Sequence, residues 1–248
     1  MDSETYSYRF AAELLTSPAY AAHYQQIVAI VKALPLLTWP GKSRNNQRLD
    51  VVQQCLNAYF DRRLSDEGWS FHPLATRILE SGLAADFRKD CDGLRVQIEV
   101  QFGNMARWYS DIFKFQTAYS QDLADIGICI VPMTSLAVRI DSNVTNFERV
   151  KRELPSAKLS ITLPILVIGV SSGAETPTIN LSRSRFTSVK DLTGRGNTEN
   201  KYRIVNGFLN GQPIARIGPD SDPGRIPVGS ADEDDTLGVP GMGVVYRV

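Results

Sequence analysis

The sequence predicts an α/β fold: a mixed β-sheet flanked by helices, with additional N-terminal helices and a β-rich, irregular C-terminal arm. Residues 94–102 alternate polar and apolar side chains, as a strand with one apolar face does. Residues 126–133 and 161–170 are largely apolar and rich in β-branched residues, which is typical of strands covered on both faces. Helical patterns precede these strands and lie between them.

The N-terminal third is predicted to be helical. Apolar residues recur at helical spacing through residues 4–34, with a break at Ser17-Pro18, where a serine before a proline suits the start of a new helix. We therefore expect two helices there. Prolines and a glycine interrupt residues 35–41, and a third helix is predicted at residues 45–64.

Residues 84–89 and 94–102 are predicted to form a hairpin, because the turn-like sequence Asp90-Cys91-Asp92-Gly93 separates them. On the second strand the polar residues, Glu99 and Gln101 among them, share one face. The elements predicted after the hairpin are a helix at 105–123, a strand at 126–133, a short helix at 146–154 and a strand at 161–170.

The composition changes near Ser171, where Gly, Pro, Ser, Thr and Asn become frequent and short candidate strands remain at 202–205 and 213–217. We expect residues 1–170 to form the core with its N-terminal helices, and residues 171–248 to form an arm of the same domain. An acidic run follows at 232–235. The basic residues in the first half of the arm are Arg183, Arg185, Lys190, Arg195, Lys201 and Arg203.

The charge balance gives little information about partners. The 27 basic and 27 acidic residues cancel, which removes the argument for a generally basic surface but is compatible with a basic cleft in an otherwise acidic molecule. Two histidines, neither beside a Cys, Ser or carboxylate motif, argue against zinc hydrolysis and histidine-based triads.

The sequence also predicts a compartment. Cys55, Cys91 and Cys129 match neither a zinc site nor a disulfide framework, so we expect reduced thiols. The N-terminus lacks the basic patch and apolar run of a signal peptide, and no stretch reaches transmembrane length. We therefore expect a soluble, cytoplasmic protein with no membrane partner.

The hairpin carries the candidate chemistry. An aspartate on one strand, Asp86, and a glutamate on its partner, Glu99, can bring two carboxylates together on one sheet face, a hard oxygen site suited to Mg²⁺. Gln101 follows Glu99 by two residues and therefore points the same way. From the pattern alone, an ordinary solvated strand face is an equally good interpretation.

These residues resemble the BglII/BstYI family of type II restriction endonucleases, within the PD-(D/E)xK nuclease superfamily. The resemblance covers residues 84–170 and includes DFRKD, IEVQFGN, the helix bearing Phe113-Lys114-Phe115 and the strand ending Val131-Pro132-Met133. The superfamily usually has Glu-x-Lys, whereas this family has Glu-x-Gln, and the present sequence shows the same departure at Gln101.

The resemblance implies Mg²⁺-dependent hydrolysis of DNA phosphodiesters. It implies that Asp86 and Glu99 ligate the metal, that the main-chain carbonyl of Val100 completes the site, and that Gln101 faces the attacking water. A glutamine can orient a water but cannot act as a cation or general base, which shifts activation onto the metal. Asp90 and Asp92 stay alternatives to Asp86, because the turn looks longer than in the family.

The resemblance further implies that loops at the active-site end read DNA bases, since asparagine can bind adenine with two hydrogen bonds. The arm would contribute to DNA recognition or dimerisation. Asn104 is equally suited to cap the helix that follows it. The DNA-binding candidates are Asn104, Asp141, Ser142, Asn143, Arg183 and Arg185.

The function expected from the resemblance is cleavage of double-stranded DNA at a short palindromic site, centred on GATC and leaving 5′ overhangs. We expect a homodimer, because a two-fold enzyme matches a two-fold site. A cognate DNA methyltransferase would protect the host. The alternatives are a structure-specific or repair nuclease of the same superfamily, a catalytically silent DNA-binding module, and a small interaction protein with fortuitous motifs.

Overall fold

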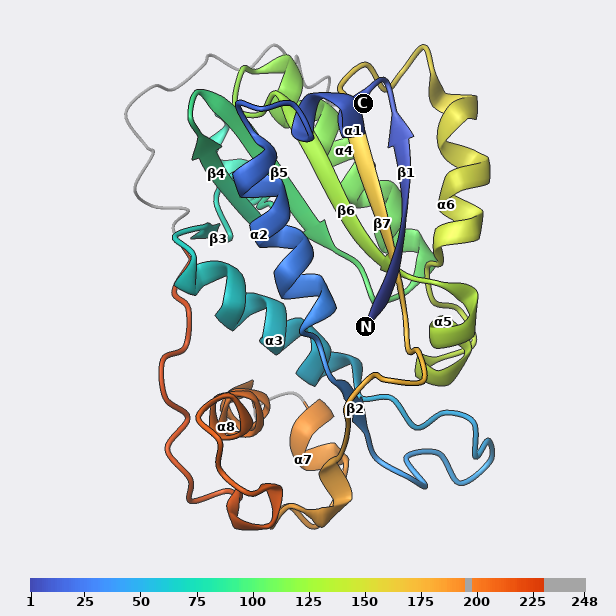
Figure 1. Ribbon diagram of the computed structural model, residues 1–248, viewed down its shortest axis with the longest axis vertical. Helices are drawn as coiled ribbons and strands as arrows, with labels where there is room; N and C mark the ends of the chain where they lie inside the picture. The colour runs from blue at the N-terminus through green and yellow to red at the C-terminus, as the bar shows by residue number, and fades with distance from the viewer. Residues whose placement is uncertain (195–197, 230–248) are drawn as a thin grey trace, which may run out of the picture.

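The computed structural model describes residues 1–194 and 198–229, and within them a mixed sheet of six strands lies between helices (Figure 1). The strand order is β1-β7-β6-β5-β4-β3. Strands β5, β6 and β7 are parallel, and β1, β4 and β3 pair with their neighbours in antiparallel fashion. The predicted mixed sheet is confirmed. The bounds are β1 Asp2–Tyr8, β3 Ser70–Phe71, β4 Phe87–Cys91, β5 Leu94–Val100, β6 Ile126–Pro132 and β7 Ile165–Ser171.

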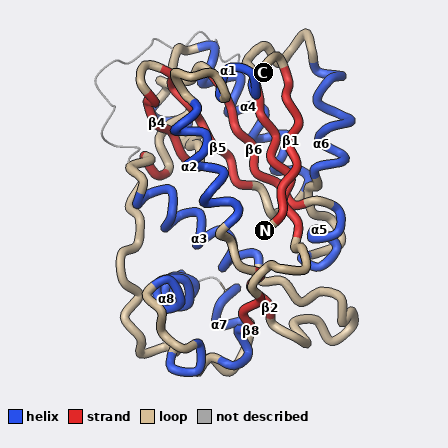
Figure 2. The backbone as a smooth tube through the Cα atoms, in the orientation of Figure 1, coloured by secondary structure: helices blue, strands red, loops and turns tan. Residues whose placement is uncertain are grey.

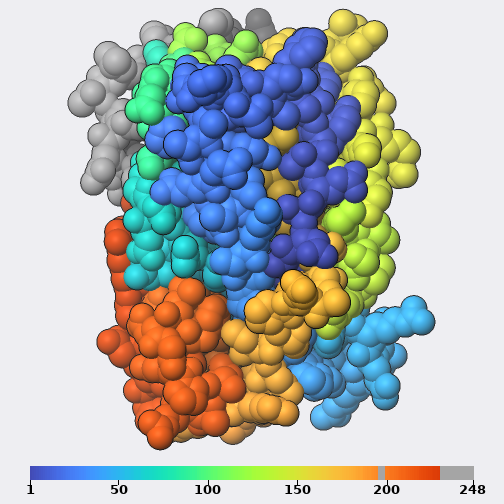
Figure 3. Space-filling view, in the orientation of Figure 1, coloured from blue at the N-terminus to red at the C-terminus, as the bar shows by residue number. Residues whose placement is uncertain are grey.

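Helices cover both faces of the sheet. The front face carries α2 and α3, whereas α4 lies behind the sheet (Figures 1 and 2). In the space-filling view, the N-terminal residues cover the front of the sheet (Figure 3). The helix bounds are α1 Ala11–Leu15, α2 Ala21–Lys32, α3 Gln53–Asp66, α4 Met105–Ser120, α5 Thr134–Ile140 and α6 Phe147–Glu153.

The period-two alternation of the central strands divides their side chains between two cores. On β6, Ile128 and Ile130 join the core beneath α2 and α3, while Cys129 and Val131 join the core beneath α4 and α6. The two apolar runs, which form β6 and β7, are therefore covered on both faces, as predicted. On β5 the same rule directs Glu99 and its polar neighbours toward α4, where they are buried instead of solvated.

The prediction of two helices across residues 4–34 is wrong at its start. The first residues form β1, which pairs with β7 from Asp2↔Ser171 to Tyr8↔Ile165, and only then do α1 and α2 follow. The edge of β7 offers backbone groups that need partners, and pairing with this distant strand outweighs local helical spacing.

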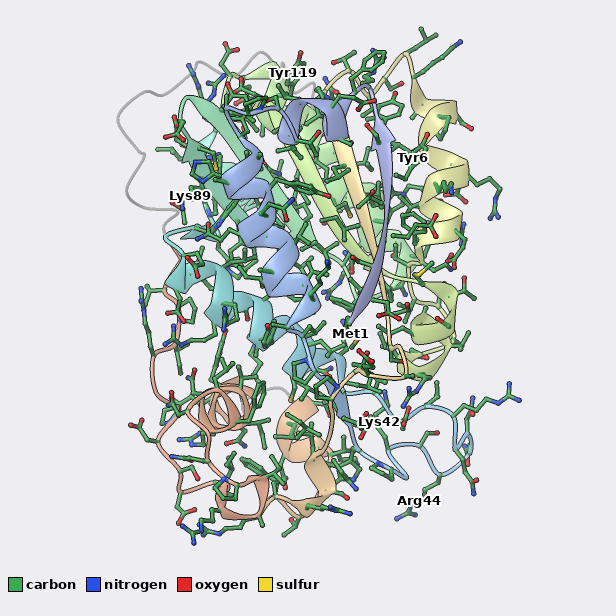
Figure 4. All side chains as sticks on the ribbon, viewed as in Figure 1. Met1, Tyr6, Lys42, Arg44, Lys89 and Tyr119 are labelled. Carbon is green, nitrogen blue, oxygen red and sulfur yellow. The ribbon has the colours of Figure 1, made fainter. Side chains whose placement is uncertain are left out.

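The third predicted helix begins later than expected. Residues 45–52 are not helical, and α3 starts at Gln53. Lys42, on the loop that follows β2 (Leu36–Thr38; Figure 4), fixes this segment, because its Nζ donates to the carbonyls of Val51 (2.6 Å) and Ile140 (2.7 Å).

The C-terminal arm is mainly helical in its described part, which corrects the β-rich prediction. Residues 202–205 lie in α8 (Thr198–Leu209) and residues 213–217 surround a 3-10 turn at Ile214–Arg216. A short apolar run does not by itself distinguish strand from helix, and here Tyr202 and Val205, one helical turn apart, are buried. The arm adds α7 (Lys190–Thr193) and the strand β8 (Thr178–Asn180), which pairs with β2. Arg195 and the acidic run at 232–235 lie outside the described residues.

The cysteines and the lengths of the helices complete the description of the fold. The three cysteines are free and buried. No helix in residues 1–194 and 198–229 is both long enough and apolar enough to span a membrane.

Candidate active site

The hairpin of β4 and β5 places Asp86 beside the end of β5. Asp92 and Gly93 form its turn with φ of 56° and 89°, the positive values that a tight hairpin turn requires. Phe87 pairs with Ile98, so Asp86, the residue just before β4, lies next to Glu99 of β5. The backbone N–H of Val100 donates to Asp86 Oδ2 at 2.8 Å, which fixes this carboxylate at the open end of the hairpin.

The two alternative aspartates lie at the opposite end of the hairpin. Asp90 Oδ1 accepts from the backbone N–H of Gly93 at 2.6 Å, and Asp92 Oδ2 lies 2.9 Å from His23 Nε2. The first interaction lies within the turn, and the second joins the turn to α2. Of the three candidates for the first carboxylate, the structure therefore brings Asp86 to the vicinity of Glu99.

Helix α4 adds an aspartate and a lysine to the site. Asp111 and Lys114 are three residues apart and so share one face of the helix. Lys114 Nζ donates to Glu99 Oε2 (2.8 Å) and to Asp111 Oδ1 (3.1 Å). Asp111 Oδ2 accepts from Gln101 Nε2 at 2.6 Å. The side chains are 0% (Glu99), 5% (Asp111) and 15% (Lys114) exposed, so the network is largely desolvated.

A glycine in the sheet sets the distance between α4 and β5. A Cβ at Gly127 would lie 2.8 Å from the ring of Phe115, closer than real Cβ contacts come. The absent side chain lets Phe115 pack directly on β6. Lys114 is the residue before Phe115, so the same packing also brings the Lys114 ammonium group to Glu99.

Burial dominates the electrostatics of the three carboxyl groups. It raises the pKa of Asp86 and Asp111, and the pKa of Glu99 stands well above its usual value because burial and the neighbouring Asp86 act together. Lys114 opposes these shifts. Burial of the ammonium lowers its own pKa, but the three carboxylates raise that pKa more, so Lys114 stays charged.

Asp86, Asp111 and Lys114 line a cavity of about 600 Å³, and Glu99 is fully buried in contact with Lys114. The hairpin contributes Asp86, Val100 and Gln101 to its wall. Helix α3 contributes Gln53, Asn57 and Asp61, and α4 contributes Arg107, Ser110, Asp111 and Lys114. From the arm, Lys201 and Tyr202 of α8 complete the wall, and Asp61 accepts from the Tyr202 hydroxyl at 2.9 Å. The arm is thus part of the site.

The donor set fits a magnesium ion. Among the described residues, no three His, Cys, Asp or Glu side chains are grouped so that they could hold a metal by themselves. Asp86 and Glu99 supply two carboxylates, and Val100 lies at the cavity wall. Because Mg²⁺ usually takes one or two carboxylates and keeps waters or substrate phosphates as its other ligands, a two-carboxylate site next to an open cavity suits it.

Residues 3–170 match the family described as Restriction endonuclease BglII/BglIII. The chain belongs to this family. It is therefore a restriction endonuclease, that is, a DNA-cleaving enzyme. The match ends at residue 170, the last residue of the predicted core.

The fold is similar to that of BglII itself. A crystal structure of restriction endonuclease BglII complexed with a DNA 16-mer has a TM-score of 0.59 and 19% sequence identity, over 71% of this chain and 81% of that chain. Free BglII has a TM-score of 0.52 and 18% identity, over 71% and 82% of the two chains. At these identities the likeness concerns the fold. No curated protein sequence matches the chain.

Three of the DNA-binding candidates of this BglII-family chain line one groove. It measures about 430 Å³ and shares Gln53, Asn57 and Arg107 with the cavity that holds Asp86. Its remaining wall is polar and includes Asn104, Asp141 and Asn143. The Asn104 side chain also caps α4, accepting from the N–H of Ala106 at 2.8 Å.

The structure does not bring the other candidates to this groove. Ser142 is not among its lining residues, and its N–H donates to Asp141 Oδ1 at 2.6 Å. Arg183 lines a separate pocket between β8 and α8, and Arg185 pairs with Asp220 at 2.8 Å.

Sequence reasoning assigned no role to the residues that α3 and α4 contribute, although a signal was present. Asp111 stands three residues after Trp108 and four before Phe115, so a charge interrupts the apolar stripe of α4. Gln53, Asn57 and Asp61 recur every four residues, which places three polar side chains on one face of α3.

Proposed function

We propose that this restriction endonuclease cleaves double-stranded DNA at a short palindromic site, as a Mg²⁺-dependent homodimer in which each subunit cuts one strand. We further propose a site centred on GATC and products with 5′ overhangs. The observation that carries the proposal is a cavity lined by Asp86, Gln101 and Lys114 that continues into a groove lined with amides, with the buried Glu99 held by Lys114.

Asp86, Glu99 and the carbonyl of Val100 would hold the metal. A bound Mg²⁺ would supply activation of a water and neutralisation of charge on the phosphate. The chain positions both carboxylates: the Val100 N–H holds Asp86, while Gln97 Nε2 (2.8 Å) and Lys114 hold Glu99.

Gln101 is suited to orient the attacking water. Its Nε2 donates to Asp111, and its Oε1 accepts from the backbone N–H of Gly103 at 2.9 Å. Gln101 Nε2 therefore still has one free N–H, and Oε1 still has one free lone pair. The fixed amide can therefore hold a water without moving itself.

The charge around the cavity supports the requirement for a metal. Among the described residues its wall has three carboxylates, of Asp61, Asp86 and Asp111, against the cations of Arg107, Lys114 and Lys201, and Glu99 is buried in contact with Lys114. A phosphodiester would therefore meet no net positive charge there. A divalent cation would make the site positive, so DNA and metal would bind together.

The groove supplies the chemistry for base recognition. Asn104, Asn143 and Gln53 offer amides, which pair well with adenine, and Asp141 can accept from cytosine. Ser142 would assist from the same loop, while Arg183 and Arg185 would contact phosphate or guanine outside the groove. A methyltransferase modifying the same site would protect DNA in the cytoplasm that the two enzymes share.

The test is digestion of a fully sequenced, unmethylated plasmid with Mg²⁺ or with EDTA, followed by mapping of the product ends. Discrete Mg²⁺-dependent fragments with common ends would support the proposal and reveal the recognition sequence. Smeared products would favour a structure-directed nuclease. Intact DNA in every metal and buffer would favour a silent binding module.

A further inference from the structure

The positive charge nearest the paired carboxylates comes from α4 instead of the catalytic strand. Directly after β5, position 101 is a neutral amide, and the Lys114 ammonium reaches Glu99 from the facing helix. Among the described residues, Lys114 is the cation that an ion pair links to Glu99. Lys201, on the opposite wall, pairs with Asp61 at 3.5 Å.

Lys114 still has a donor to offer. An ammonium group has three N–H bonds, and two of them point to Glu99 and Asp111. The side chain also lines the cavity and is 15% exposed, so the third N–H is accessible from the space where DNA would enter. Its two carboxylate partners hold the group in place before a substrate arrives.

The packing of α4 makes this position rigid. Phe115, the next residue, is fully buried against Gly127 of β6, and the Asn104 cap fixes the start of the helix. A charge held rigidly in a desolvated site stabilises a transition state more than a mobile one, because it needs no reorganisation during the reaction.

We propose that Lys114 is a catalytic residue of the cleavage reaction: its ammonium contacts the scissile phosphate and neutralises the negative charge that builds up there. This inference rests on the proposed function. In the hydrolysis one water is consumed. Its oxygen bonds to phosphorus, the bond from phosphorus to the 3′ oxygen breaks, the water loses a proton and the 3′ oxygen gains one. Lys114 keeps its protons throughout and supplies charge.

The test measures single-turnover cleavage at saturating DNA and, separately, the thermal shift caused by Ca²⁺. The variants are Lys114→Met, which removes the charge, and Lys114→Gln, which keeps a hydrogen-bond donor beside the carboxylates if the first does not fold. The double variant Lys114→Met/Gln101→Lys places a lysine directly after β5, at position 101. Lys151→Met is the matched control, because Lys151 pairs with Glu4 on the surface.

We expect both single variants to cleave about 100-fold or more slowly than the wild type, with the Ca²⁺ shift retained. We expect the double variant to recover at least about tenfold and Lys151→Met to match the wild type. Single variants that cleave as fast as the wild type would overturn the inference. So would loss of the Ca²⁺ shift in parallel with activity, since Lys114 would then only position Glu99. If the wild type itself leaves DNA intact, the proposed function fails instead.

Discussion

Asp86 and Asp90 lie four residues apart on one hairpin but have different surroundings. Asp86 is half-buried, accepts from the Val100 N–H and faces the cavity, whereas Asp90 is exposed and stabilises the turn through Gly93. A carboxylate that would hold the metal is expected to be essential, and one that closes a turn is not.

Asp86→Ala is expected to reduce DNA cleavage at least about 100-fold, because the site loses a metal ligand. Asp90→Ala should stay within about threefold of the wild type, since it removes one exposed turn hydrogen bond. Single-turnover cleavage rates, with circular dichroism to check folding, measure both effects. The opposite ranking of the two variants would place the first metal ligand at the turn.

The pKa of Asp61 makes the free energy of unfolding depend on pH in the mildly acidic range. Burial raises its pKa to about 6 from 3.8, although Lys201 and Tyr202 act in the other direction. Between pH 3.8 and about pH 6, the folded protein therefore holds a proton on Asp61 that the unfolded chain has lost. The contribution of Asp61 to the free energy of unfolding is fully present below the pKa of Asp61 in the unfolded chain. It is lost as the pH rises through the pKa of Asp61 in the folded protein.

Asp61→Asn should remove this contribution to the pH dependence. Between about pH 4 and pH 7, the free energy of unfolding of the wild type should fall by roughly 2–3 kcal/mol relative to the variant. Urea unfolding at a series of pH values measures the difference. Parallel pH profiles would mean that Asp61 is ionised at its ordinary pKa.

At the scale of elements, the position of α4 decides the site, because one helix carries Arg107, Asp111 and Lys114. Its contact with the sheet depends on Gly127, whose missing side chain the Phe115 ring occupies. Stability and catalysis are therefore coupled at this contact.

Gly127→Ala is expected to destabilise the protein by about 1–3 kcal/mol, the usual cost of overpacking a core. Cleavage should fall as well, because Phe115 can yield only by shifting α4 and the lysine next to it. Thermal unfolding and cleavage rates test this pair of effects. Gly229→Ala is the control, since its new Cβ would lie an ordinary 3.6 Å from His72.

The N-terminus of α4 allows capping and base reading to be separated. Serine caps helices about as well as asparagine but has no amide. Asn104→Ser should therefore keep the melting temperature and lower cleavage of the cognate site about 10-fold or more, the usual loss for a bidentate base contact. If cognate cleavage is unchanged, Asn104 is a cap alone.

At the scale of the whole molecule, the arm closes one side of the site. Helix α8 packs against α3 and places Lys201 and Tyr202 at the cavity that contains Asp86. The arm lies beyond the residues that match the BglII family, yet it lines the same cavity as Asp86. Removal of the arm would therefore open the cavity and expose the apolar side of α3.

Cleavage of both strands of a palindrome requires two active sites related by two-fold symmetry. Sedimentation equilibrium should therefore give twice the 27.5 kDa mass of the chain at micromolar concentration. Dilution below the dimer dissociation constant should slow double-strand cleavage. A concentration-independent monomer with full activity would contradict the homodimer.

The sequence by itself determined the hairpin and the shared face of its polar residues. The period of two in a strand fixes the side on which Glu99 and Gln101 lie, whatever covers it. Apolar β-branched runs likewise identified β6 and β7, and helical periodicity identified α4. These features depend on residues close together in the chain.

Only the tertiary structure decided which elements meet. Residues 2–8 became a strand because β7, more than 150 residues later, offers an edge, and residues 202–205 became helical because α3 accepts an apolar helix face. Similarly, Lys114 contacts Glu99 through the packing of α4 on the sheet. Local patterns show which side of an element is polar or apolar, but long-range packing determines what that side contacts.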